Sequence, residues 1–141
     1  MINKIKIITF GKIKEDYIKT GILEYWKRLQ IFCKIEIMEL KDQGREKNSK
    51  TLERYINKNT FLLDEEGQEY DSISFSEFIK KINQEPTFII GGYDGFNSDI
   101  KEKFNKISLS KMTMIHDMTR LFLFEQIYRS FMVLNNKKYH K

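Results

Sequence analysis

The chain has 141 residues, a length typical of one domain, and it carries a formal net charge of +5. Apolar residues make up 40% of it and charged residues 32%, a composition that supplies a buried core and excludes a disordered chain. We therefore expect a single folded domain over residues 1–141.

The basic residues gather at both ends of the chain. Residues 1–14 hold four lysines, residues 126–141 hold four basic side chains, and neither stretch has an acidic one. Such a surface would attract a polyanion such as nucleic acid, although the same charge could serve solubility alone. Cys33 is a lone cysteine and cannot form an intramolecular disulfide, and lysines interrupt each apolar run near the start. We expect a cytoplasmic protein without a membrane-spanning segment.

Short apolar runs alternate with helical patterns along the whole chain. Strands are expected at residues 5–10, 33–40, 60–63, 87–90 and 107–109. Helices are expected at 15–29, after a cap at Ser49, after a capping pair of Ser74 and Glu77, after a cap at Ser98, and from Asp117 onward. The polar stretch 41–49 is predicted to be a mobile connection, and the acidic stretch 64–67 a turn that ends its strand. This alternation favours an α/β domain with a mostly parallel sheet.

In such a sheet, ligands bind beyond the carboxyl ends of the strands, so the turns at 63–67, 91–96 and 108–116 are the candidate site. The glycines of the second turn match neither a dinucleotide-binding pattern nor a P-loop, and either a close ligand or a tight turn would explain them. The polar run from Ser108 to Met114 could bind a ligand through its backbone groups or form an edge strand.

Other polar residues near the end of the chain are less distinctive taken singly. His116 precedes the last helix and could contact a substrate or cap the turn. Glu125 and Arg129 have the spacing of an ordinary intrahelical ion pair, and the tail with Tyr139 and His140 is typical of disorder by composition. The two histidines are far apart and there is one cysteine, so we expect no metal site.

Three patterns occur together in this chain. Ile89-Ile90 precedes the glycine turn, the last helix carries H-x-x-x-R-x-x-x-x-E-x-x-Y-R from His116 to Arg129, and the sequence ends in Tyr139-His140-Lys141. In these patterns the chain resembles the RlmH family, bacterial methyltransferases of the SPOUT superfamily that modify a pseudouridine in large-subunit ribosomal RNA. Matching residues begin at Gly11-Lys12, so the resemblance covers essentially the whole chain.

The resemblance implies a fold, an assembly and a cofactor. The fold would be a SPOUT-type α/β domain, with a mostly parallel sheet flanked by helices and a C-terminal trefoil knot, a topology nearly absent from other proteins. The protein would be a homodimer that uses S-adenosylmethionine and acts on 23S ribosomal RNA in the 70S ribosome. Its contacts with S-adenosylmethionine would fall at Leu63, Gly91, Leu109, Ser110, Lys111, Met112, Thr113 and Met114.

The resemblance also suggests groups for the substrate step, in which N3 of pseudouridine loses a proton and receives the methyl group. His140 would position the base or remove its proton, and Tyr139 would stack on it or hydrogen-bond to it. On this resemblance we expect both residues to be ordered against the site, despite the composition of the tail. His116, Arg120 and Arg129 would lie near the RNA. The alternatives are a SPOUT methyltransferase that acts on transfer RNA and an RNA-binding module without enzymatic activity.

Overall fold

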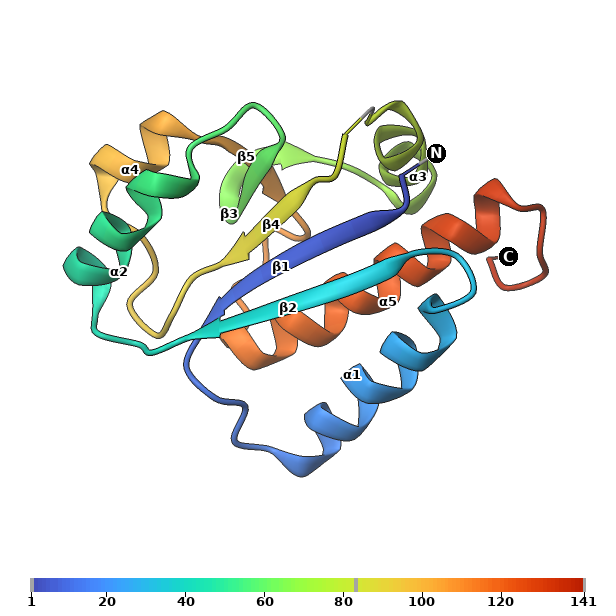
Figure 1. Cartoon of the computed structure of the whole chain (residues 1–141), viewed down its shortest axis with the longest axis horizontal. Helices are drawn as coiled ribbons and strands as arrows, with labels where there is room; N and C mark the ends of the chain where they lie inside the picture. Colours follow the sequence, from blue (N-terminus) through green and yellow to red (C-terminus); the bar gives the residue numbers. More distant parts are fainter. Residues whose placement is uncertain (1, 83, 141) are drawn as a thin grey trace.

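Parallel strands form one sheet in the order β2-β1-β4-β3-β5 (Figure 1). The computed structural model describes residues 2–82 and 84–140. Its strands are β1 (Lys4–Phe10), β2 (Lys34–Leu40), β3 (Thr60–Glu69), β4 (Thr87–Ile90) and β5 (Asn105–Ser108). The prediction of an α/β fold with a parallel sheet is confirmed.

Helices cover both faces of the sheet (Figure 1). One layer holds α1 (Asp16–Leu29), α3 (Ser72–Lys81) and α5 (His116–Leu134), and the other holds α2 (Arg45–Leu52), the short 3-10 turn η1 (Glu53–Tyr55) and α4 (Ser98–Lys103). Both α1 and α3 pack against α5. The strand order alone does not establish the trefoil knot, which stays a prediction.

Strand side chains alternate between two hydrophobic cores, because successive residues of a strand point to opposite faces. Ile5 and Ile7 of β1 belong to the core under α1, α3 and α5, whereas Ile8 and Phe10 belong to the core under α2 and α4. Cys33 lies in the first core, where burial raises the pKa of its thiol to about 11. This thiol therefore stays protonated and unreactive at neutral pH.

The polar stretch 41–49 was predicted as a mobile connection, and for residues 45–49 this is wrong. Helix α2 begins at Arg45, so Ser49 lies inside the helix and does not cap it. Asn48 and Ser49 are both buried, with 2% and 1% of their surface exposed. Their side chains bond to backbone N–H groups of Gln43 and Asn97. The buried face of α2 thus contains hydrogen-bonded polar side chains. It lacks the apolar periodicity by which a buried helix face is normally recognised in a sequence.

Two helix caps lie earlier than the sequence patterns indicated. The N-cap of α3 is Asp71, whose carboxylate accepts a hydrogen bond from the N–H of Ser74 while the Ser74 hydroxyl accepts one from the N–H of Asp71. The N-cap of α4 is Asn97, which accepts from the N–H of Ile100. Ser74 thus fills the third helical position of a capping box and is not its first residue.

Strand β3 does not end at the acidic stretch but continues beyond it to Glu69. Leu63 and Gln68 are both in register with Ile107 of β5, so the four residues between them bulge out of the ladder. A Cβ atom on Gly67 would lie 2.6 Å from the backbone nitrogen of Ile107, which explains the glycine. The turn predicted at 64–67 is therefore a bulge within the strand.

A buried hydroxyl on β1 offers a test of the first core. Thr9 is 2% exposed, and its Oγ1 has no hydrogen-bond partner among the described residues. We expect Thr9→Val to raise the free energy of unfolding by about 1 kcal/mol, because it removes an unsatisfied polar group at nearly constant volume. Urea unfolding measures the change. Ser76→Ala, which removes a buried hydroxyl that donates to the carbonyl of Ile73, should instead lower stability; a loss of stability in Thr9→Val would contradict the prediction.

Candidate active site

The carboxyl ends of β4 and β5 lie next to Leu63 of β3, just before its bulge, at one edge of the sheet. Leu63 is in register with Ile90 of β4 and with Ile107 of β5, so the residues that follow those strands begin next to it. Gly91 directly follows β4, and the segment 109–114 directly follows Ser108, the last residue of β5. The bulge at 64–67 and the turns after β4 and β5 therefore begin at this edge, where ligands of parallel sheets bind.

The segment 109–115 is an irregular loop, which excludes the edge-strand alternative. Two serines shape it: the Ser108 hydroxyl donates to the carbonyl of Ser110 at 3.0 Å, and the Ser110 hydroxyl accepts from the N–H of Met112 at 2.9 Å. The side chains of residues 111–113 are exposed, that of Met112 at 79%. Because these residues join no strand ladder, their backbone groups remain candidates for contact with a ligand.

The glycine turn after β4 is explained by packing within the protein. A Cβ atom on Gly91 would lie 3.2 Å from both the Cα of Gly95 and the ring of Phe96. A Cβ atom on Gly92 would lie 2.5 Å from the carboxylate of Asp42, and Gly95 has a φ of +71°, which favours glycine. Of the two explanations left open by the sequence, the tight turn accounts for these glycines without a ligand.

Arg120 holds the end of β1 against α5. Its guanidinium is 3% exposed, and Nη2 donates to the carbonyls of Phe10 and Gly11, each at 2.8 Å. Burial lowers the pKa of Arg120, partly offset by the nearby carboxylates of Asp117 and Glu39. A contact between Arg120 and RNA would require the guanidinium to leave these carbonyls. Its position indicates a structural role that sequence patterns could not show, because the acceptors are backbone atoms about 110 residues away.

The first turn of α5 is also tied to the loop after β1. Asp117 is 5% exposed, and its carboxylate accepts a hydrogen bond from the N–H of Lys14 at 3.2 Å. The Nε2 atom of His116 lies 3.3 Å from the other oxygen of Asp117. His116 thus lies at the same sheet edge as the three turns, and its proximity to RNA stays a prediction.

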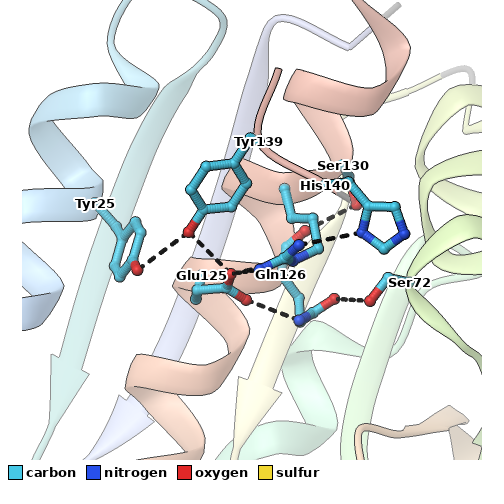
Figure 2. A network of polar contacts seen from close by, with 8 residues as sticks. Tyr25, Ser72, Glu125, Gln126, Ser130, Tyr139 and His140 are labelled. Atoms are coloured by element: carbon cyan, nitrogen blue, oxygen red, sulfur yellow. Dashed lines mark hydrogen bonds and ion pairs between the residues drawn. The ribbon is translucent and has the colours of Figure 1, made fainter. Parts of the chain in front are cut away.

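The tail is ordered against α5 (Figure 2). Glu125 accepts hydrogen bonds from Nη2 of Arg129 at 2.7 Å and from the hydroxyl of Tyr139 at 3.0 Å. His140 meets Arg129 through Nδ1 at 3.1 Å, and the hydroxyls of Tyr25 and Tyr139 are 3.3 Å apart. The order that the family resemblance implies for Tyr139 and His140, against the disorder typical of such a composition, is confirmed, whereas Lys141 lies outside the described residues.

The same network shows that Glu125 and Arg129 are more than an intrahelical ion pair. Arg129 lies over the ring of Tyr139 with 4.7 Å between guanidinium carbon and ring centroid, and Tyr128 packs edge-on against that ring at 4.9 Å. Helical spacing predicts the pair of Glu125 and Arg129, but it cannot predict that Glu125 also accepts a hydrogen bond from Tyr139 in the tail. Side chains of α5 therefore fix the tail from two sides.

The network defines the protonation states of the tail. Burial raises the pKa of Tyr139, so its phenol remains a neutral hydrogen-bond donor. The hydrogen bonds that Arg129 donates to Glu125 raise the pKa of Arg129. Because a guanidinium only donates, the Nδ1 atom of His140 accepts, and a neutral His140 ring carries its proton on Nε2. In this arrangement His140 presents a donor, and Tyr139 is not a base.

The tail and the sheet edge lie at opposite ends of α5 (Figure 1). Helix α5 starts at His116, directly after the loop 109–115, and Glu125 and Arg129 lie about 14 and 20 Å further along its axis, at about 1.5 Å per residue. Within one chain, the predicted catalytic residues and the predicted cofactor residues are therefore not brought together.

The structure describes residues 2–82 and 84–140. Over that part of the chain, no group of three or more His, Cys, Asp and Glu side chains is arranged to hold a metal ion. No helix there has the length and apolar character that crossing a membrane requires.

Comparison with known proteins places these features in a family. The family described as "Predicted SPOUT methyltransferase" matches residues 3–140. The chain belongs to the SPOUT methyltransferase family. Relatives of this SPOUT methyltransferase include proteins named "Ribosomal RNA large subunit methyltransferase H" from Trichlorobacter lovleyi, 40% identical over 97% of this chain and 99% of the relative, and from Streptococcus uberis and Mycoplasmopsis agalactiae, each 42% identical over 98% and 99%.

The family match spans both parts of the candidate active site. It includes the sheet edge with Leu63, Gly91 and the segment 109–114, and it reaches His140 in the tail. Each of these relatives is matched over 99% of its length. Methyl transfer is therefore the reaction for which the candidate site has to account.

Proposed function

We propose that this protein transfers the methyl group of S-adenosylmethionine to N3 of a pseudouridine in 23S ribosomal RNA within the 70S ribosome. The supporting observation is the nearly full-length match to relatives named for methylation of large-subunit ribosomal RNA, together with the family match that reaches His140. The cytoplasm, where ribosomes are, is the expected compartment.

The sheet edge is the proposed site of the methyl donor. S-adenosylmethionine would supply a methyl group on a positively charged sulfur, so the protein has to bind and orient it. Leu63, Gly91 and the segment Leu109 to Met114 would hold it. The fit is supported by the loop after Ser108, which leaves the sheet ladder and so retains backbone donors and acceptors beside Leu63.

The tail is the proposed site of the pseudouridine. N3 carries a proton that must leave before or during methyl transfer, and the base has to lie with N3 facing the donor. His140 presents a hydrogen-bond donor at Nε2, which suits one of the two carbonyl oxygens that flank N3. The hydroxyl of Tyr139 already donates to Glu125, so Tyr139 would contact the base through its ring. Arg129 would hold His140 and add positive charge near the RNA backbone.

A complete site requires a second copy of the chain, because tail and sheet edge lie at opposite ends of α5. We propose a homodimer in which the tail of one subunit faces the sheet edge of the other. Met112 and Ile115 at that edge are 79% and 61% exposed, which suits burial against a partner. Light scattering at micromolar concentration should give about twice 17.0 kDa; a mass near 17.0 kDa would exclude the dimer.

One labelling experiment separates the candidate functions. The protein is incubated with methyl-labelled S-adenosylmethionine and, in parallel, with 70S ribosomes from a strain that lacks this modification or with unmodified transfer RNA. Label at N3 of a pseudouridine in 23S ribosomal RNA is the expected result. Label in transfer RNA alone would identify a transfer-RNA methyltransferase, and RNA binding without label would indicate a binding module; either outcome overturns the proposal.

A further inference from the structure

A carboxylate on the segment after β2 holds the turn after β4. Asp42 lies between β2 and α2, and its Oδ2 accepts a hydrogen bond from the backbone N–H of Tyr93 at 3.1 Å. A Cβ atom on Gly92 would lie 2.5 Å from the same oxygen, so the turn passes against the carboxylate without space for a side chain. Because β1 lies between β2 and β4, this segment reaches across the end of β1 to make the contact.

Asp42 is itself fixed by α2. Its Oδ1 accepts hydrogen bonds from Nδ2 of Asn48 at 2.9 Å and from the N–H of Gly44 at 3.1 Å. Asn48 is buried, and its side-chain oxygen accepts from the N–H of Gln43 at 2.9 Å. The hydrogen bond from Asn48, with those from the backbone N–H groups, lowers the pKa of Asp42. The carboxylate is therefore an ionised and well-anchored support for the turn.

Other contacts from α2 hold the far half of the turn. Nε of Arg45 donates to the carbonyl of Asp94 at 2.9 Å, and the hydroxyl of Ser49 accepts from the N–H of Asn97 at 3.0 Å. Asp42 contacts the near half, at Gly92 and Tyr93, directly after Gly91. Loss of its carboxylate would thus free the part of the turn closest to the proposed methyl donor.

We propose that Asp42 is a positioning residue for the methyl donor, which holds the turn 91–95 in the conformation that binds the donor. This inference rests on the proposed function, because it requires the donor to lie against Gly91. A turn that samples other conformations binds its ligand more weakly, in proportion to the time spent in the competent one. Transfer from a donor already bound would be unaffected, because Asp42 contacts the turn and not the reacting atoms.

The variant Asp42→Asn removes the support selectively. An asparagine can turn its oxygen toward the two donors on Asn48 and Gly44, which leaves its NH₂ group opposite the N–H of Tyr93. We expect calorimetry to give a dissociation constant for S-adenosylmethionine about tenfold higher than wild type. The KM for the donor should rise similarly, while kcat at saturating donor stays within about twofold. Hydrogen exchange at the Tyr93 amide should become faster.

Asp99→Asn is the matched control, because it removes the same charge from an exposed position in the first turn of α4. It should leave donor affinity and Tyr93 exchange unchanged. If Asp42→Asn does not fold, Gly92→Ala tests the same contact from the turn, because its Cβ atom would push the turn away from the Asp42 carboxylate. This variant should give the same rise in KM at constant kcat.

Wild-type affinity in Asp42→Asn, or a fall in kcat with an unchanged KM, would overturn the inference while the proposed function stands. Absence of donor binding to the wild-type protein would instead overturn the proposed function.

Discussion

Deletion of Tyr139, His140 and Lys141 is expected to lower the rate of methyl transfer to 70S ribosomes by about 100-fold or more and to leave donor affinity nearly unchanged. The two effects should separate because the tail packs on the second half of α5, far from Leu63, Gly91 and the loop after β5. Single-turnover labelling measures the rate, and calorimetry with S-adenosylmethionine measures the affinity.

The control for this deletion is the double variant Lys137→Ala, Lys138→Ala. It removes two exposed charges from the same tail and leaves the contacts of Tyr139 and His140 with α5 in place. We expect weaker ribosome binding, especially at high salt, with an unchanged rate at saturating ribosomes. Full activity of the deleted protein would show that the tail is only a solvated basic end.

Replacement of His140 alone should cause much of this loss. The pH profile of His140→Ala and the rate of His140→Gln distinguish positioning of the base from removal of its proton. Since Nδ1 accepts from Arg129, the ring presents the Nε2 proton as a donor, which favours positioning of the base over removal of its proton. We therefore expect His140→Ala to be slow with a pH profile like that of the wild type, and His140→Gln, which keeps a donor, to recover part of the rate. A residual rate in His140→Ala that rises steeply with pH would instead identify His140 as the base.

Replacement of Arg120 by methionine is expected to lower the free energy of unfolding by about 3–5 kcal/mol. The buried guanidinium satisfies the carbonyls of Phe10 and Gly11 and lies near the carboxylates of Glu39 and Asp117. Methionine fills much of the volume but leaves these acceptors without a donor and the carboxylates without a neighbouring positive charge. Urea unfolding followed by circular dichroism measures the loss.

Arg28→Met is the matched control for Arg120, because Arg28 makes a solvent-exposed ion pair with Glu24 on α1. Exposed pairs contribute little to stability, so this variant should unfold nearly as the wild type does. Arg120→Lys, which keeps the charge but not the two-carbonyl contact, should lie between wild type and Arg120→Met. Equal stability of Arg120→Met and Arg28→Met would show that Arg120 is free to contact RNA.

The sequence by itself determined the class of fold and the edge of the sheet at which the predicted cofactor residues lie. The run from Ile5 to Phe10 predicted strand β1, and the structure confirms that strand. Because the strands are parallel, the segments that follow Leu63, Ile90 and Ser108 had to begin at one edge. These predictions depend on residues that are close in the chain, and local periodicity reports them well.

Only the tertiary structure decided which groups Asp42, Arg120 and the tail contact. Asp42 bonds to the N–H of Tyr93, 51 residues away, and Arg120 to carbonyls about 110 residues away. Backbone groups are the same for every residue type, so no sequence pattern marks them as partners. Tyr139 likewise becomes ordered through contacts with Glu125 and Tyr25 on two different helices. The physical reason is common to all three: each hydrogen bond forms only when folding brings distant segments together, and residue spacing along the chain contains no record of that proximity.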